Sequence, residues 1–167
     1  MLEPRLLTDR LELRPVKAKD LAWYAQLRAR DGLDASAAAA RLRDAVEHWK
    51  RHGFGKFAIF LDEEPAGLIT LNHAGGGLVG IAAKEVDLGW YVFPHLWGRG
   101  IAPEAAAAVV RWAHDAGIEA LVVYIRQGNP ASTRVAQKLG LGREPDGRAR
   151  DGDAIEVYRP KSMPHYA

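Results

Sequence analysis

The stretch from residue 86 to residue 105 decides the fold, and it reads VDLGWYVFPHLWGRGIAPEA. It begins as an apolar strand, which Pro94 terminates because proline has no N–H to donate to a β-ladder. A turn with Gly98 and Gly100 follows, and we expect a helix over 103–116. The unpaired N–H groups of a helix start attract anions, and glycines let the main chain approach a ligand closely. The segment therefore predicts an anion site, most naturally for a pyrophosphate.

Around this segment, hydrophobic periodicity and cap residues indicate the remaining elements. We expect strands over 8–17, 57–61, 67–71, 85–93, 121–126 and 155–159, and helices over 21–30 (with Asp20 as N-cap), from about 34 or 36 to 51, 103–116 and 130–140. The order is then β-α-α-β-β-β-α-β-α-β, with antiparallel hairpins first and one β-α-β crossover later. This order predicts an α/β (α+β) fold with a mixed sheet and helices on its faces.

Composition narrows the function classes. The 167 residues suit one domain, which we expect to span 1–167. Twenty-three Lys and Arg against 21 Asp and Glu leave a formal charge of +2, which gives no reason to expect nucleic-acid binding. The absence of cysteine excludes disulfides, thiolate metal sites and a cysteine nucleophile. Because no apolar run is long enough to span a membrane, we expect a soluble cytoplasmic protein.

Other phosphate-binding loops fit the glycine pair poorly. A Walker loop needs Gly-Lys followed by Ser or Thr, whereas Phe57 follows Gly55 and Lys56. A dinucleotide-binding loop needs a third small residue where Pro103 stands. On the glycines alone, an ordinary strand-to-helix turn stays an equally good interpretation.

Three blocks in register carry a family resemblance. They are TDRLELRP at 8–15, the 86–105 stretch, and NPASTRV followed by KLGL within 129–141. Their order and spacing resemble the GNAT superfamily of N-acetyltransferases, most closely its RimJ/RimL-like (ribosomal-protein-N-acetyltransferase-like) branch. The resemblance implies the GNAT fold, in which the strands ending near Val92 and Val123 splay apart.

The same resemblance implies a co-substrate and partners. These are acetyl-CoA and an amine acceptor, a peptide N-terminus or a small molecule, which attacks the thioester directly in a ternary complex. A homodimer stays open, and neither nucleic acid nor membrane is expected. The resemblance implies coenzyme contacts at Val92, Trp97, Gly98, Arg99, Gly100, Ile101, Ala102 and Asn129. Three positions depart from the family pattern, because His95 replaces Gln or Arg, Ala136 replaces a tyrosine general acid and Leu141 replaces the usual Phe.

Two residues are candidates for catalysis. An alkyl amine must lose a proton before it attacks, and Asp87, where the family usually carries Glu, is favoured over Glu85 as the base. Both carboxylates also fit as solvated charges at a strand end. Ser132 is the candidate acid for the leaving thiolate, with Tyr91 and Tyr124 as alternatives, although a serine there also fits as a residue that solvates the helix start.

The sequence admits three further interpretations. His48 and His52 are four residues apart on the second predicted helix, but the HExxH motif and a third nearby ligand are missing, so we expect no metal. Because Ala136 replaces the usual acid, a non-catalytic acyl-CoA-binding or sensing module is the alternative function. A Rossmann-like dehydrogenase is a weaker third alternative.

Overall fold

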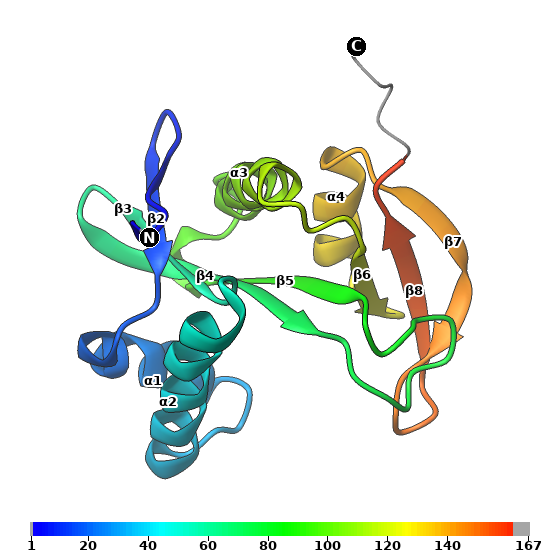
Figure 1. The fold of residues 1–167 in the computed structure, drawn as a ribbon, viewed down its shortest axis with the longest axis horizontal. Coiled ribbons are helices and arrows are strands. Elements are labelled where there is room, and N and C mark those ends of the chain that lie inside the picture. Colours follow the sequence, from blue (N-terminus) through cyan, green and yellow to red (C-terminus); the bar gives the residue numbers. More distant parts are fainter. Residues whose placement is uncertain (1, 162–167) are drawn as a thin grey trace. The chain divides into compact units, whose positions relative to one another are not determined.

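The computed structural model describes residues 2–161, within which lie eight β-strands, four α-helices and two short 3-10 helices (Figure 1). The strands are β1 (Leu6–Leu7), β2 (Leu11–Pro15), β3 (Phe57–Leu61), β4 (Glu64–His73), β5 (Val86–Val92), β6 (Leu121–Arg126), β7 (Gly142–Arg148) and β8 (Ala154–Arg159). The helices are η1 (Ala18–Asp20), α1 (Leu21–Ala29), α2 (Ala35–His52), η2 (Pro94–Leu96), α3 (Ile101–Asp115) and α4 (Pro130–Lys138). In this part of the chain no helix combines the length and the apolar character needed to cross a lipid bilayer. The predicted mixed α/β fold is confirmed.

The chain forms two compact units. Within the described residues, the first comprises 2–71 and 90–109, and the second comprises 72–89 and 110–161. The strands β4 and β5 and the helix α3 pass from one unit into the other along the chain.

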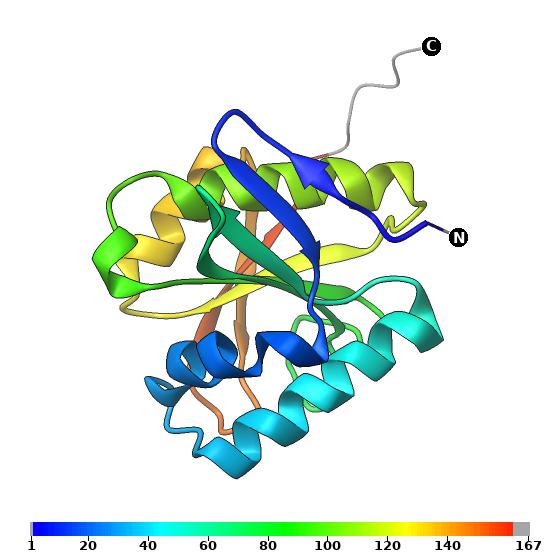
Figure 2. The same cartoon turned by 90° about the vertical axis from the view of Figure 1, so that its left-hand side faces the viewer.

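In the first unit, β1, β2, β3 and β4 pair in sequence as an antiparallel meander. Alternation along β2 buries Leu11 and Leu13, while the residues between them stay half-buried. Helices α1 and α2 lie side by side against these strands (Figure 2), and they bury Tyr24 and Leu42 in a shared core. The unit is therefore a sheet with one face covered by a helical pair.

The predicted starts of the first two helices had different outcomes. Asp34 caps α2 as expected, accepting a hydrogen bond from the Ala37 N–H at 2.7 Å. Asp20 occupies the N-cap position of α1 as predicted, but its side chain makes no cap hydrogen bond. Its buried carboxylate instead accepts two hydrogen bonds from Arg14, at 2.8 and 2.9 Å, and one from the Lys17 N–H at 2.7 Å. Burial raises the pKa of Asp20, but these hydrogen bonds outweigh burial and the pKa lies below its usual value.

In the second unit, the start of β5 runs parallel to β6, which confirms the predicted crossover through α3. Their register is Val86 opposite Leu121 and Asp87 opposite Val122. From Val123 onward β6 pairs with β8 in an antiparallel ladder, and β7 pairs with the other edge of β8. The ladder between β5 and β6 thus stops after two steps, as the predicted splay of the central strands requires.

Periodicity missed two strands. The strand β7 has the sequence GREPDGR, which contains a proline and mostly exposed polar residues, so no apolar alternation indicates it. It is a strand because its main chain pairs with β8, with a bulge between Glu144 and Gly147. The two-residue β1 is too short to carry a pattern. The hairpin turn is also tighter than expected, because Asp62 and Glu63 adopt φ of 48° and 67° and β4 already begins at Glu64.

Gly67 permits the closest main-chain approach in the first unit. A Cβ at this position would lie 2.1 Å from the carbonyl oxygen of Tyr91. We expect Gly67→Ala to lower the free energy of unfolding by about 1–3 kcal/mol, because β4 and β5 would have to separate. Thermal unfolding monitored by circular dichroism measures the loss. The control is Gly76→Ala, where a Cβ meets no atom within 4 Å and φ is ordinary, and equal melting temperatures for the two variants would contradict the expectation.

Candidate functional site

The glycine turn that follows β5 lies in the first unit and leads directly into α3. Gly98 and Gly100 have φ of 75° and 74°, in the left-handed region that glycine adopts without strain. The helix α3 begins at Ile101, two residues earlier than predicted, so Ile101 and Ala102 belong to its first turn. The first N–H groups of a helix have no partner within the helix. The turn therefore has the main-chain geometry of an anion site.

Trp97 ties this turn to the end of β5. Its indole Nε1 donates a hydrogen bond to the Val92 carbonyl oxygen at 2.8 Å, although 61% of the residue is exposed. The guanidinium of Arg30, at the end of α1, lies 5.2 Å from the centre of the Trp97 ring. Arg99, another of the predicted coenzyme contacts, is exposed. Two of the predicted coenzyme contacts, Val92 and Trp97, are thus brought together by a direct hydrogen bond.

Arg10 is a residue of this site that the sequence analysis missed. Its guanidinium forms an ion pair with Glu104 in the first turn of α3, at 3.0 Å. A Cβ on Gly100 would lie 3.6 Å from the Arg10 Nη2 atom, so the guanidinium stands beside the glycine turn. Ninety-four residues separate Arg10 from Glu104, and no local pattern relates two residues so far apart. The only hint in the sequence was that Arg10 and Glu104 carry opposite charges and could therefore form an ion pair.

In the second unit, Asp87 is a half-buried carboxyl on β5. Burial raises its pKa to about 7, and the positive charge of Arg150 opposes this shift. Arg150 is held in place by the glycine-rich segment 74–77, because its guanidinium donates hydrogen bonds to the carbonyl oxygens of Gly76, at 2.9 Å, and Ala74. A carboxyl with a pKa near neutrality exchanges its proton readily at physiological pH.

Glu85 has a different environment, although it is two residues from Asp87. Its carboxylate accepts hydrogen bonds from Arg159 at 2.7 and 3.0 Å and from the Ala82 N–H at 2.8 Å. The hydrogen bond from Arg159 holds the pKa of Glu85 below its usual value. Glu85 is therefore an ionised structural partner of Arg159, and the interpretation of it as a solvated charge is wrong. This difference favours Asp87 as the base.

The start of α4, also in the second unit, positions Asn129 and Ser132. The Asn129 side-chain oxygen accepts a hydrogen bond from the Ser132 N–H at 3.2 Å, so Asn129 is the N-cap of this helix. The Ser132 side chain is half-buried. Ala136, where the family pattern has tyrosine, is fully buried. The alternative Tyr124 lies on β6 and is half-buried.

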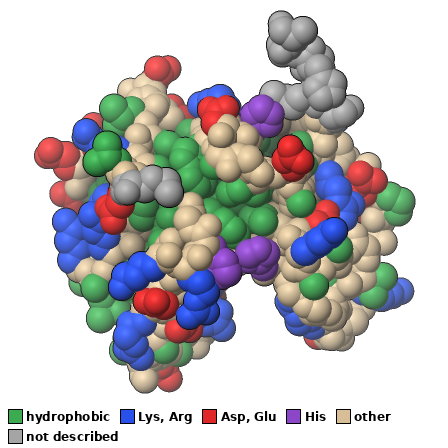
Figure 3. Space-filling model, in the orientation of Figure 1, with side chains coloured by type: hydrophobic (Ala, Val, Ile, Leu, Met, Phe, Trp, Pro, Cys, Tyr) green, Lys and Arg blue, Asp and Glu red, His purple; other side chains and the backbone are tan. Residues whose placement is uncertain are grey.

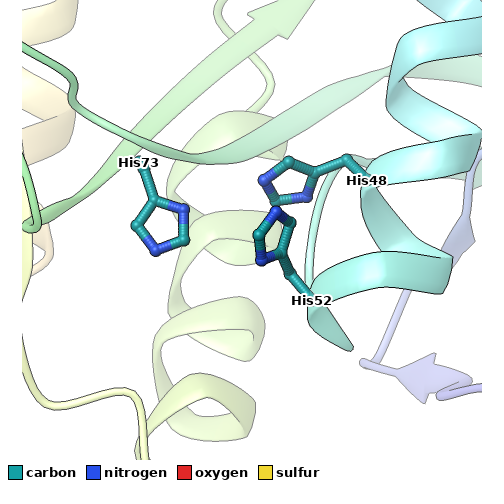
Figure 4. A group of neighbouring side chains, drawn as sticks. All are labelled: His48, His52 and His73. Carbon is teal, nitrogen blue, oxygen red and sulfur yellow. The ribbon is translucent and has the colours of Figure 1, made fainter.

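The two histidines of α2 lie close together near the end of that helix. Figure 4 shows His48 and His52 on neighbouring turns, and their ring centres are 4.5 Å apart. The Nδ1 atom of His48 is 2.7 Å from the carbonyl oxygen of Phe54, and both rings contact the Phe54 ring. These contacts connect the end of α2 to the segment before β3. His73, the third residue labelled there, ends β4 in the second unit.

Comparisons with known proteins agree on one family. A family model described as an acetyltransferase (GNAT) domain matches residues 10–142. An acetyltransferase from Agrobacterium tumefaciens strain C58 is 30% identical with a TM-score of 0.78, covering 95% of this chain and 94% of that chain. A protein described as a GNAT-family acetyltransferase from Bordetella pertussis is 26% identical with a TM-score of 0.81, covering 93% and 98%. RimL, a ribosomal L7/L12 alpha-N-protein acetyltransferase solved with coenzyme A, is 19% identical with a TM-score of 0.77, covering 93% and 96%.

These comparisons confirm the resemblance carried by the three sequence blocks. The family match runs through both compact units and includes the whole glycine turn. The RimL structure has the same fold, in agreement with the RimJ/RimL-like pattern. The chain belongs to the GNAT family and is an acetyltransferase.

Proposed function

We propose that this acetyltransferase moves the acetyl group of acetyl-CoA to a primary amine, which attacks the thioester directly in a ternary complex. The observation that carries the proposal is the turn over 98–102, whose two left-handed glycines precede the first turn of α3. Main-chain N–H groups in that arrangement suit a pyrophosphate, because they present several donors and the positive end of a helix dipole. Because the chain belongs to the GNAT acetyltransferase family, we expect that pyrophosphate to be the one in coenzyme A.

The coenzyme contacts proposed here use mostly main-chain atoms. The N–H groups from Gly98 to Ala102 bind the pyrophosphate, and the main chain at Val92 binds the pantetheine arm. Asn129 contributes a further contact from the start of α4. Arg10 beside Gly100 supplies positive charge, in a site where His95 stands at the position that the family pattern gives to Gln or Arg.

Counted from the ammonium form, two protons leave the nitrogen and one proton reaches the sulfur. Asp87, directly or through water, accepts the proton of the ammonium form, and the freed amine forms a bond to the thioester carbon. The oxygen of the tetrahedral intermediate becomes anionic and is stabilised by the main-chain N–H at Val92. Collapse breaks the C–S bond, and Ser132 donates its proton to the leaving thiolate. The second proton leaves the nitrogen and returns to the Ser132 oxygen, directly or through water. The products are the amide and coenzyme A.

The acceptor is a peptide N-terminus or a small-molecule amine. This proposal rests on two observations. One is the RimJ/RimL-like sequence pattern, and the other is the structural similarity to RimL, which is described as an alpha-N-protein acetyltransferase. The alternative of a non-catalytic sensor has less support, because Asp87 has a pKa that suits proton exchange near neutrality.

Asp87→Asn tests the proposed base. We expect kcat to fall by about 10²–10⁴-fold, the usual contribution of a general base, while the Kd for coenzyme A stays unchanged. In the wild type, kcat rises as the pH passes upward through about 7, because Asp87 then loses its proton; the variant loses this rise. Thiol release measured from pH 5.5 to 9 gives both results.

Glu85→Gln is the matched control for this variant. It removes one negative charge two residues earlier, and we expect it to preserve the pH profile while lowering the melting temperature, because Arg159 loses its partner. Wild-type turnover in Asp87→Asn, or the same loss of turnover in both variants, would remove Asp87 as the base.

Arg10→Gln tests the proposed charge beside the turn. We expect the Kd for coenzyme A to rise roughly two- to tenfold, as loss of one hydrogen-bonding charge typically causes, and the difference to shrink as KCl is added. Isothermal titration calorimetry measures both. Arg5→Gln is the control, since Arg5 also lies near the N-terminus and is also ion-paired, with Glu12 at 2.8 Å. Equal affinities for the two variants would assign Arg10 a structural role alone.

A further inference from the structure

Three cations gather in the first unit on segments that the proposed reaction does not use. Arg28 comes from α1, Arg41 from α2 and Lys56 from the residue before β3. Arg28 is 8% exposed, and its guanidinium lies 4.3 Å from the centre of the Tyr91 ring. Lys and Arg side chains are prominent over the α1 and α2 region in Figure 3. We call Tyr24, Arg28, Arg41 and Lys56 the cationic cluster.

Two buried polar atoms of this cluster lack hydrogen bonds. Among residues 2–161, the only buried side-chain N or O atoms without a hydrogen-bond partner are the Tyr24 hydroxyl and the Arg28 Nε. Tyr24 is 0% exposed. The Arg28 Nε lies 3.2 Å from a carboxylate oxygen of Asp31, which makes an ion pair without hydrogen-bond geometry. Because buried polar groups in folded proteins are nearly always hydrogen-bonded, two such atoms in one cluster indicate a missing acceptor.

The charges of the cluster act on one another. Burial, together with the positive charges of Arg28 and Arg41, lowers the pKa of Lys56 to about 8, while Asp44 opposes the shift. Burial also raises the pKa of Tyr24, against the influence of the same two arginines. Two carboxylates, Asp31 and Asp44, stand against three cations, so the local formal charge is 3 − 2 = +1. An additional anion would therefore be attracted to the cluster.

We propose that the cationic cluster binds an anionic group of the amine acceptor, a carboxylate or a phosphate. The oxygens of that group accept hydrogen bonds from the Tyr24 hydroxyl and the Arg28 guanidinium. The inference rests on the proposed function, because Tyr91, against which Arg28 packs, directly precedes Val92, the proposed contact of the acetyl-bearing arm. The acceptor class is thus an amine that carries a negative charge near the reacting nitrogen.

Matched pairs of acceptors test the inference in the complete protein. The pairs are β-alanine with β-alaninamide, O-phosphoethanolamine with ethanolamine, and the peptides Ser-Asp-Ala-amide with Ser-Asn-Ala-amide. We expect the anionic member of at least one pair to have a kcat/KM about tenfold or more above its neutral partner, as hydrogen bonds to charged groups typically provide. The pair that shows the preference distinguishes a carboxylate from a phosphate. Equal or better use of the neutral member in every pair would overturn the proposal.

Tyr24→Phe and Arg41→Gln show whether the cluster causes the preference. Tyr24→Phe removes a hydroxyl that has no partner, so the fold should survive, and we expect the anionic-to-neutral ratio of kcat/KM to fall. The Arg41 side chain is exposed, so we expect Arg41→Gln to lower the same ratio roughly two- to fivefold. The matched control is Arg43→Gln, which removes an exposed cation from the same helix and should leave the ratio unchanged. A ratio that both cluster variants leave intact would overturn the proposal.

Direct binding separates this inference from the proposed function. Inorganic phosphate and acetate are titrated at constant ionic strength, with coenzyme A saturating so that its own phosphate contacts are occupied. We expect one of the two anions to raise the melting temperature in the wild type and in Arg43→Gln, and to do so less in Arg41→Gln. If no amine is acetylated but the anion-induced rise in melting temperature still depends on Arg41, the proposed acetyl transfer to amines is wrong and the proposed anion site is supported. Should neither anion act through Arg41, the anion site fails whatever the turnover.

Discussion

The main chain of β5 must find partners for its hydrogen-bonding groups on both edges, and the rest of the site depends on how it does so. One edge faces β4, where Phe93 donates to Ala66 and the missing side chain of Gly67 permits close approach to Tyr91. The other edge pairs with β6 for only two steps. Beyond those steps the Val92 carbonyl accepts a hydrogen bond from the Trp97 side chain. A strand edge released from its ladder has main-chain groups that an extended ligand can pair with.

The glycine turn likewise presents main-chain groups rather than side chains. Gly98 and Gly100 adopt the left-handed conformation and lead the chain from β5 into α3, so the N–H groups of the turn and of the first helical residues come together. Anion binding of this type depends on main-chain donors and the helix dipole. The proposed site would therefore tolerate a change such as His95 in place of Gln or Arg, provided that some nearby cation remains. Arg10, held by Glu104, occupies such a position.

Environment rather than residue type separates the carboxylates near the proposed base. Glu85 and Asp87 are two residues apart, but Arg159 binds Glu85 directly, whereas the influence of Arg150 on Asp87 is outweighed by burial. One carboxyl is held ionised and the other has a pKa near neutrality. The same reasoning distinguishes Asp34, which caps α2, from Asp20, whose carboxylate is bound by Arg14.

Local sequence signals determined a large part of this protein. Both ends of β6 were predicted to the residue, and the C-terminal end of α2 was predicted to within one residue. The three family blocks identified the acetyltransferase fold. These predictions were possible because apolar periodicity, cap residues and glycine turns act over a few residues. Tertiary structure alone decided that GREPDGR forms β7, that Arg10 stands beside Gly100, and that Tyr24, Arg28, Arg41 and Lys56 form the cationic cluster. Strand pairing, ion pairing and desolvation depend on distances between residues that are far apart in the chain, and no local pattern encodes those distances.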